Sequence, residues 1–290
     1  MKEVVVLSGK GGTGKTSVVG AFAAMPGRKV LSDCDVDAAD LHLLLSPEVK
    51  EEHEFWSGQV AEIDPDVCTR CGLCEEACRF DAIQDYKVDP VGCEGCGLCA
   101  RVCPASAIAM RDCLAGHWYI SSTRFGPLVH ARLGIAQENS GKLVHLVRQK
   151  SKETAEAQGI ELTINDGPPG VGCAVISSLS GANLAFIVTE PSVSGIHDME
   201  RGLSVCEHFG IPALVCINKF DINEEGSRQI ETFCATRGIE VVAHIPFDRR
   251  VTEAQVQGVP LVEYTDAPEL IDPITRAWRA VCGTIDVEDS

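Results

Sequence analysis

A glycine-rich segment near the N-terminus has the spacing of a phosphate-binding loop. Residues 8–16 read Ser-Gly-Lys-Gly-Gly-Thr-Gly-Lys-Thr, which satisfies GxxxxGK[ST] between an apolar run at 4–7 and a helix-forming segment. Glycines let backbone N–H groups turn toward an anion, and the positive end of the helix dipole lies at the same point. Lys15 can reach the β and γ phosphates and Thr16 can hold Mg²⁺, which favours a nucleoside triphosphate site over a plain glycine-rich turn. The predicted binding residues are Gly9, Lys10, Gly11, Gly12, Thr13, Gly14, Lys15, Thr16 and Ser17.

Two groups of carboxylates follow predicted buried strands. Asp166 ends an alternating strand that begins at Ile160, and four aspartates follow the apolar segment 29–32. The carboxyl ends of parallel strands meet at one edge of an open sheet, where such folds bind their ligands. Asp166 is therefore predicted to hold Mg²⁺ through water, as a Walker B residue. The other aspartates need a cation or a water to act on, and the alternative for them is helix capping or a solvated acidic turn. These four residues are Asp33, Asp35, Asp37 and Asp40.

Eight of the 15 cysteines form an internal repeat. The spacing Cys-x2-Cys-x2-Cys-x3-Cys occurs from Cys68 to Cys78 and again, 25 residues later, from Cys93 to Cys103. Bacterial ferredoxins with two [4Fe–4S] clusters have this pattern, and the fourth cysteine of each run ligates the other cluster. Zinc in two CxxC pairs is the alternative, but zinc does not require the third and fourth cysteines at these offsets. The predicted ligands are Cys68, Cys71, Cys74 and Cys103 for cluster I, and Cys93, Cys96, Cys99 and Cys78 for cluster II.

One residue departs from the ferredoxin pattern. Arg79 follows Cys78, whereas the second run ends in Cys103-Pro104, as the pattern requires. The arginine is expected to change hydrogen bonding or exposure at cluster II, and hence its reduction potential, without removing a ligand.

The other seven cysteines are expected to be mostly small buried side chains. Cys34, beside the acidic segment, and Cys113, just past the repeat, are the candidates for redox reactivity. The full set is Cys34, Cys113, Cys173, Cys206, Cys216, Cys234 and Cys282.

The composition is that of a globular protein with 290 residues, 45% of them hydrophobic. No apolar run approaches the roughly 20 residues that a membrane span needs, and the N-terminus enters a strand without a signal-peptide pattern, so we expect a cytoplasmic protein. A formal net charge of −17 makes nonspecific binding to nucleic acid unfavourable. In such a chain, cysteines indicate metal ligands and buried thiols rather than disulfides.

Alternating strands and helices predict an α/β fold with a doubly wound, mostly parallel sheet that carries the phosphate loop. A ferredoxin-like domain with two [4Fe–4S] clusters is expected to interrupt this sheet at residues 61–112, which leaves 1–60 and 113–290 for the nucleotide-binding domain. Strands are expected at 29–32, 160–166, 183–189, 213–218 and 240–245. Helices are expected at 17–25, 197–209 and 267–282, with a further helix opening near Asn139.

A second lysine, Lys10, lies inside the loop, where the general pattern does not require one. With it, residues 10–16 resemble the deviant Walker A motif, KGGTGKT, of the MinD/ParA/Mrp group of P-loop ATPases. The resemblance implies that Lys10 crosses a dimer interface to the nucleotide of the partner subunit. It also implies that Lys15 stabilises charge during ATP hydrolysis and that Asp35 lies near Mg²⁺ and orients the attacking water. The expected partner is a second copy of the chain or a similar ATPase, in a homodimer or heterodimer.

The same resemblance gives roles to three later loops. The segment from Asp166 to Gly170 corresponds to the switch that senses the γ phosphate, and Asn218 and Pro246 lie in loops on the adenine side of the nucleotide. Residues 218–221 also have the NKxD form that reads guanine in GTPases, so GTP is the alternative to ATP. MinD ends in a basic amphipathic membrane anchor, whereas this chain ends in acidic residues, so no membrane anchor is expected.

Three functions are open at this point, with ATP, Mg²⁺ and two [4Fe–4S] clusters as the expected cofactors. The first is an ATPase that couples its nucleotide state to electron transfer with a redox protein partner. The second is a regulatory or positioning ATPase of the ParA/MinD type, in which the clusters are structural or act as sensors. The third is an iron–sulfur carrier or assembly ATPase, although eight ligands would close both clusters and oppose their release.

Overall fold

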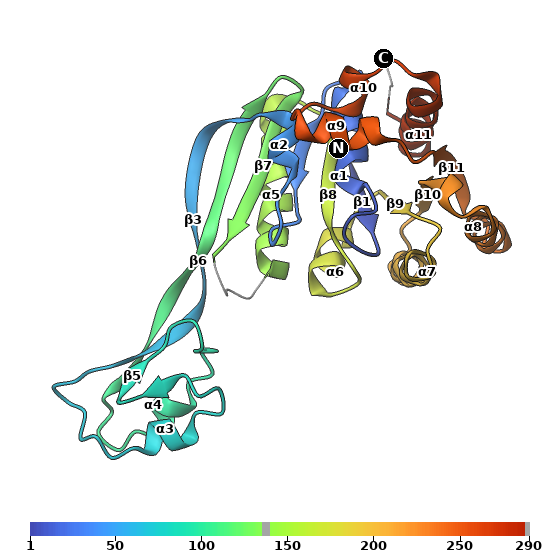
Figure 1. Ribbon diagram of the computed structural model, residues 1–290. Helices are drawn as coiled ribbons and strands as arrows, with labels where there is room; N and C mark the ends of the chain where they lie inside the picture. The colour runs from blue at the N-terminus through green and yellow to red at the C-terminus, as the bar shows by residue number, and fades with distance from the viewer. Residues whose placement is uncertain (135–139, 288–290) are drawn as a thin grey trace. The chain divides into compact units, whose positions relative to one another are not determined.

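The computed structural model describes residues 1–134 and 140–287 (Figure 1). Its main sheet has nine strands in the order β11-β10-β9-β1-β8-β2-β7-β6-β3. The strands of this sheet are β1 (Lys2–Ser8), β2 (Val30–Asp33), β3 (Glu48–Ile63), β6 (Ile108–Thr123), β7 (Gly126–Leu133), β8 (Leu162–Pro169), β9 (Leu184–Thr189), β10 (Ala213–Asn218) and β11 (Glu240–Ile245).

The pairs from β11 to β7 are parallel, and β1 lies between β8 and β9. The predicted α/β fold with a mostly parallel sheet is therefore confirmed. Parallel order brings the ends of β1, β2, β8, β9 and β10 to one edge, which is where the phosphate loop leaves β1.

Helices cover both faces of the sheet, and alternate residues of β1 therefore pack into two different cores. Val4 and Val6 pack with residues of α1, α9, α10 and α11, whereas Val5 and Leu7 pack with residues of α6, α7 and α8. All four valine and leucine side chains are at most 3% exposed. The helices are α1 (Lys15–Ala24), α2 (Leu41–Leu45), α3 (Leu73–Ala77), α4 (Leu98–Val102), α5 (Ser140–Gln158), α6 (Cys173–Leu179), α7 (Val193–His208), α8 (Glu224–Thr236), α9 (Arg249–Val256), α10 (Leu261–Tyr264) and α11 (Pro268–Ile285), with a 3-10 turn η1 (Phe220–Ile222).

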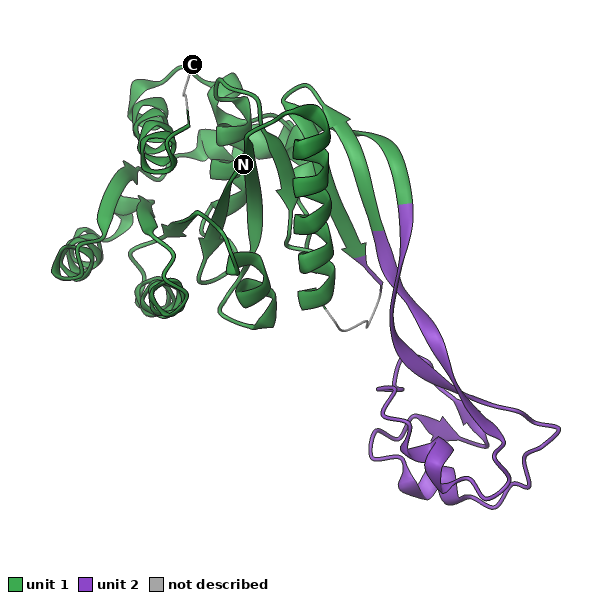
Figure 2. Ribbon diagram, turned by 180° about the vertical axis from the view of Figure 1, so that it is seen from behind, with its two compact units in different colours: residues 1–52, 118–132, 140–290 green, residues 53–117, 133–139 purple. Residues whose placement is uncertain are grey.

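The chain divides into two compact units (Figure 2). The larger unit contains residues 1–52, 118–132 and the chain from Ser140 onward, and the smaller contains 53–117 with a short segment that begins at Leu133. The smaller unit begins before the predicted boundary at residue 61 and ends after residue 112. The difference arises because β3 and β6, with 16 residues each, belong partly to each unit.

The smaller unit contains the cysteine repeat and little regular structure. Helices α3 and α4 have five residues each, and β4 (Ile83–Gln84) pairs antiparallel with β5 (Lys87–Val88). Its apolar core contains Ala61, Cys74, Ile83, Cys99 and Ile108.

Two expected features fall partly beyond the described residues. The helix predicted to open near Asn139 is described from Ser140, and Asn139 itself lies outside the described residues, as do the last three residues of the acidic C-terminus. Among the helices that the structure describes, none has the length and apolar character needed to cross a membrane.

Candidate nucleotide site and cysteine cluster

The last residue of β10, Asn218, holds the phosphate loop by a hydrogen bond. Gly14 has φ 94°, and a Cβ atom built on it would lie 2.3 Å from Nδ2 of Asn218. That side chain is buried and donates a hydrogen bond of 2.7 Å to the carbonyl oxygen of Thr13. Glycine at position 14 therefore serves both the left-handed backbone and the close approach of Asn218.

Lys219 holds the same loop at Gly12, the residue before Thr13. Its ammonium donates hydrogen bonds to the carbonyl oxygen of Gly12 at 2.8 Å and to Glu190 Oε2 at 2.9 Å. Asn218 and Lys219 thus hold consecutive peptide groups of the loop, although the sequence reading connected these residues with the nucleotide base.

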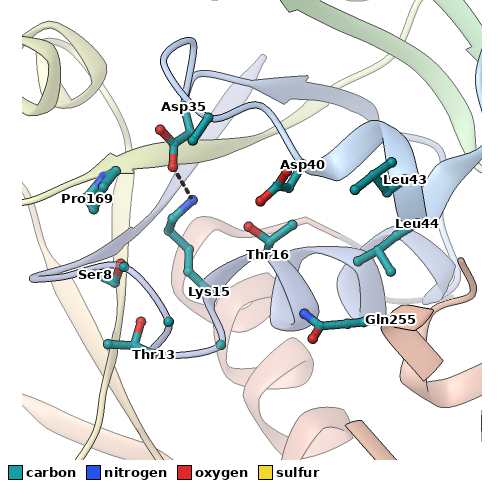
Figure 3. Close-up of a pocket in the computed structure, with 14 residues that line it drawn as sticks. Ser8, Thr13, Lys15, Thr16, Asp35, Asp40, Leu43, Leu44, Pro169 and Gln255 are labelled. Atoms are coloured by element: carbon teal, nitrogen blue, oxygen red, sulfur yellow. Dashed lines mark ion pairs between the residues drawn. The ribbon is translucent and has the colours of Figure 1, made fainter. Parts of the chain in front are cut away.

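Lys15, which the sequence predicts to be catalytic, lies together with the two predicted Mg²⁺ carboxylates. Lys15 Nζ forms an ion pair with Asp166 and lies 3.8 Å from Asp35 Oδ2, and Figure 3 shows the lysine extending toward Asp35. The Thr16 hydroxyl donates a hydrogen bond of 2.8 Å to Asp166 Oδ2. The structure therefore brings together side chains from the start of α1 (Lys15 and Thr16), from the loop after β2 (Asp35) and from β8 (Asp166).

Burial and neighbouring charges together shift the pKa values of Lys15 and Asp35. Burial lowers the pKa of Lys15, but the charges of Asp166, Asp33 and Asp35 outweigh that effect and raise it, so the lysine is a firm cation. Burial raises the pKa of Asp35 to about 6, against the opposing charge of Lys15. A carboxyl with such a pKa changes protonation close to neutral pH, which suits a group that receives a proton or orients water.

Asp33 has a structural position. It is fully buried, and its carboxyl oxygens accept the backbone N–H groups of Asp35 at 3.1 Å and Leu41 at 3.0 Å. Burial and the charge of Asp166 raise its pKa well above the ordinary value. Asp33 therefore shapes the acidic loop. Its buried carboxylate does not fit the solvated turn that the sequence left open, and its bond to the first residue of α2 is closer to the capping alternative.

A pocket lies between the loop, the acidic segment and α2. Besides the loop glycines, its lining includes Asp40, Leu43, Leu44 and Gln255, which the sequence analysis did not assign to a site, except for Asp40 in the acidic group. Gln255 Nε2 also donates to the hydroxyl of Ser17 at 2.7 Å. Leu43 is 56% exposed, and no sequence signal marks it. Figure 3 shows these side chains around the pocket.

Lys10 is directed toward its own chain. Its ammonium forms an ion pair of 2.7 Å with Glu190 Oε1 and donates to the hydroxyls of Ser192 at 3.2 Å and Ser194 at 3.1 Å. Glu190 directly follows β9, so the rule about strand ends could have drawn attention to it. The same carboxylate also accepts from Lys219.

The predicted base-side loops meet next to each other. The N–H of Phe247, which follows Pro246, donates to Asp221 Oδ1 at 2.7 Å. This bond ties the 218–221 segment to the loop after β11. Asn218 contacts Thr13, which lines the pocket, but neither Asn218 nor Pro246 is itself part of that lining.

The four thiols predicted for cluster II line one cavity in the smaller unit. Cys78, from the first run, lies there with Cys93, Cys96 and Cys99 from the second. Burial raises the pKa of the Cys99 thiol, and the charges of the other three thiols raise it further. Cys68 acts similarly on Cys74, which is predicted for cluster I, after the larger effect of burial.

No three histidine, cysteine, aspartate or glutamate side chains in residues 1–134 and 140–287 are already arranged as a metal-binding group. The donor atoms nevertheless suit an iron–sulfur cluster, because thiolate is the ligand that such clusters take and four thiols face one cavity. Cys71 and Cys96 are exposed and the other six repeat cysteines are partly or fully buried.

Of the remaining cysteines, five are buried and two are not. Cys34 is fully buried and burial raises its pKa to about 12, so its reactivity as a thiolate is low at neutral pH. The expectation that most of these cysteines are buried is therefore confirmed, and Cys173, at the start of α6, is the exposed one. Cys113 is partly buried.

A parallel sheet, a glycine loop that leads into a helix, and a lysine next to two strand-end aspartates define a P-loop nucleotide-binding protein. A family model described as the CobQ/CobB/MinD/ParA nucleotide binding domain matches residues 4–261. The chain belongs to this family of nucleotide-binding proteins.

Known proteins support the family over most of the chain. The uncharacterized protein MJ0578 of Methanocaldococcus jannaschii is 35% identical over 224 residues, which are 76% of this chain and 79% of that protein. The uncharacterized protein MJ0579 of the same organism is 26% identical over 95% of this chain and 97% of its own length. An iron–sulfur cluster carrier protein of Pyrococcus horikoshii is 28% identical over 43% of this chain and 48% of its own length.

Solved structures show the same fold. The septum site-determining protein MinD of Pyrococcus horikoshii, complexed with Mg-ADP, superposes with a TM-score of 0.58 and 19% identity. The alignment covers 97% of this chain and 95% of that structure.

Proposed function

We propose that the protein hydrolyses ATP and couples its nucleotide state to electron transfer through two [4Fe–4S] clusters. The observation that carries the proposal is the cavity lined by Cys78, Cys93, Cys96 and Cys99, because it unites thiols of both runs in a chain that also has a P-loop site. That combination is what the exchanged fourth ligand of a two-cluster protein requires.

The nucleotide half of the proposal assigns roles to the phosphate loop, Lys15, Thr16, Asp35 and Asp166. Backbone N–H groups of the loop and the Lys15 ammonium bind the phosphates and stabilise the charge that develops during attack on the γ phosphate. Thr16 and Asp166 would hold Mg²⁺, which neutralises phosphate charge when bound, and Lys15 would exchange its pairing with Asp166 for the phosphates. Asp35, with its pKa of about 6, orients the attacking water.

ATP is preferred to GTP as the nucleotide. In the NKxD pattern the aspartate is the residue that reads guanine, and here Asp221 accepts a hydrogen bond from the backbone of Phe247. Asn218 serves the phosphate loop through Thr13.

Lys10 makes hydrolysis depend on dimerisation. To reach the nucleotide of a partner subunit, its ammonium leaves Glu190, Ser192 and Ser194, so the single-chain arrangement is a resting position. A homodimer satisfies this proposal. The presence of two long relatives in one organism also makes a heterodimer of similar ATPases a partner to test.

The iron–sulfur half distinguishes this proposal from its two rivals. The clusters would be held by Cys68, Cys71, Cys74 and Cys103, and by Cys93, Cys96, Cys99 and Cys78, and each would accept and release one electron. The carrier alternative is favoured by one observation, the partial similarity to the carrier protein of Pyrococcus horikoshii. That match spans less than half of either chain, and eight thiols that close two clusters oppose their release.

The decisive experiment measures the cluster potentials without nucleotide, with ADP and with a nonhydrolysable ATP analogue, in protein purified without oxygen. The coupling proposal expects potentials that shift with the nucleotide and partner reduction that depends on hydrolysis. Unchanged potentials with hydrolysis-independent reduction would refute it. Transfer of a cluster to an apo-ferredoxin would establish the carrier function instead.

Two lysine variants test the ATPase half separately. Lys15→Ala should abolish nucleotide binding, whereas Lys10→Ala should retain binding and lose dimer-dependent hydrolysis. Glu190→Gln is the matched variant, because it removes the resting partner of Lys10 and should let dimers form at lower protein concentration in sedimentation experiments. Full hydrolysis by Lys10→Ala would contradict the proposed shared site.

A further inference from the structure

The two cysteine runs end in turns of the same backbone geometry. Cys78 has φ −78° and ψ 102°, and Cys103 has φ −73° and ψ 109°. The carbonyl oxygen of Cys78 accepts the N–H of Asp81 at 3.3 Å, and that of Cys103 accepts the N–H of Ser106 at 3.2 Å. Asp81 and Ser106 also share a positive φ, 51° and 50°. The sequence repeat is therefore a structural repeat down to these turns.

The next residue is where the two turns differ. Pro104 follows Cys103 and has no backbone N–H, whereas Arg79 follows Cys78 and has both an N–H and a guanidinium. The extended backbone of Cys78 is the conformation that precedes a proline, so the fold itself does not require arginine at position 79. Arg79 is exposed, and its guanidinium has no ion-pair partner among the residues that the structure describes.

The difference concerns one cluster more than the other. Cys78 lines the same cavity as Cys93, Cys96 and Cys99, although it belongs to the other run. Phe80, which follows Arg79, lines this cavity too. The residues on either side of Arg79 therefore form part of the wall that would surround cluster II, and Arg79 itself lies exposed between them.

We propose that Arg79 raises the reduction potential of cluster II above that of cluster I, so that electrons pass from cluster I to cluster II. This inference rests on the proposed function. Reduction adds one negative charge to a cluster, and a nearby cation and an additional N–H donor both stabilise that charge. In the transfer, cluster I loses one electron and is oxidised, cluster II gains it and is reduced, and no proton or covalent bond changes place. Redox protein partners of the proposed function supply the electron to cluster I and remove it from cluster II.

The test compares anaerobically purified full-length protein with Arg79→Pro, Arg79→Gln and Pro104→Arg variants. Each protein is titrated with dithionite and redox mediators, and the two midpoint potentials are followed by electron paramagnetic resonance. Arg79→Pro should lower the higher midpoint and leave the lower one unchanged. Arg79→Gln, which keeps the N–H and loses the charge, should lower it less. Pro104→Arg places an arginine at the equivalent position after Cys103. It should raise the lower midpoint potential, that of cluster I, and so reduce the difference between the two midpoint potentials.

The outcomes separate this inference from the proposed function. About eight irons per chain are expected for two cubane clusters, and a wild-type protein that never holds them would overturn the proposed function itself. Intact clusters whose midpoints stay the same in both Arg79 variants would overturn only the role of Arg79, as would a shift in the opposite direction. If Arg79→Pro loses iron, Arg79→Gln still decides the question, because it leaves the backbone unchanged.

Discussion

Replacing Gly14 by alanine tests whether the phosphate loop is built against the end of β10. The new Cβ atom would lie 2.3 Å from Nδ2 of Asn218, and the backbone would keep a φ of 94°. Asn218 would have to move, and its buried hydrogen bond to the carbonyl oxygen of Thr13 would break. Both effects act on the folded state before any nucleotide binds.

The expected loss of stability follows from these two effects. A left-handed backbone costs a non-glycine residue about 1–2 kcal/mol. A buried donor that loses its partner costs about 1–3 kcal/mol more. The alanine also restricts the unfolded chain, which returns about 0.4–1 kcal/mol, so the net loss in the free energy of unfolding is about 3 kcal/mol.

Urea unfolding of nucleotide-free protein, followed by circular dichroism without oxygen, measures this loss. Gly11→Ala is the matched control, because nothing lies within 4 Å of its Cβ position and its φ is not positive. The control should stay within about 1 kcal/mol of wild type. The double variant with Asn218→Ala should cost at least about 1 kcal/mol less than the sum of the two single changes, since both remove the same hydrogen bond. Full additivity, or a Gly14→Ala protein as stable as the control, would refute the reasoning.

Two further predictions concern Asp35 and the free thiols. The folded-state pKa of Asp35 is about 6 and its ordinary value is 3.8, so the folded state binds this proton more tightly and the contribution of Asp35 to stability weakens as the pH rises from about 4 to 6. In protein without nucleotide or Mg²⁺, Asp35→Asn should remove that slope from the pH profile of urea unfolding, and an unchanged slope would contradict the cited pKa. Cys173 is exposed and Cys34 is buried with a pKa of about 12, so iodoacetamide should label Cys173 in the native protein and reach Cys34 only after unfolding, as read by mass spectrometry. Labelling of Cys34 in the native protein would contradict the burial of its side chain.

The parts of the fold that sequence predicted best are those with local signals. Strands β10 and β11 have the predicted bounds, because each is a short buried run between turn residues. The meeting of Lys15, Asp35 and Asp166 is the arrangement expected from the phosphate-loop motif, the family resemblance and the shared edge of parallel strands. In these cases the local pattern and the tertiary position agree.

The long strands β3 and β6 could not be predicted in the same way. The first half of β3 is largely charged and exposed, so no apolar face gives the alternation that marks a strand. Its stability comes from pairing with β6, which begins 45 residues after β3 ends. The contact of Lys10 with Glu190 was missed because the two residues lie 180 positions apart, and the position of Glu190 after β9 marks a strand end without naming its partner.

Glu190 connects Lys10 to the part of the phosphate loop that Lys219 holds. The carboxylate divides its two oxygens between Lys10 at 2.7 Å and Lys219 at 2.9 Å, and Lys219 in turn holds the carbonyl of Gly12. If Lys10 left Glu190 to reach a partner's nucleotide, as proposed above, the full negative charge of Glu190 would act on Lys219 alone. The loss of one ion pair would thus change the electrostatic field at the Gly12 carbonyl, through Lys219. Each subunit of a dimer would then differ electrostatically from the free chain even at atoms outside the dimer interface.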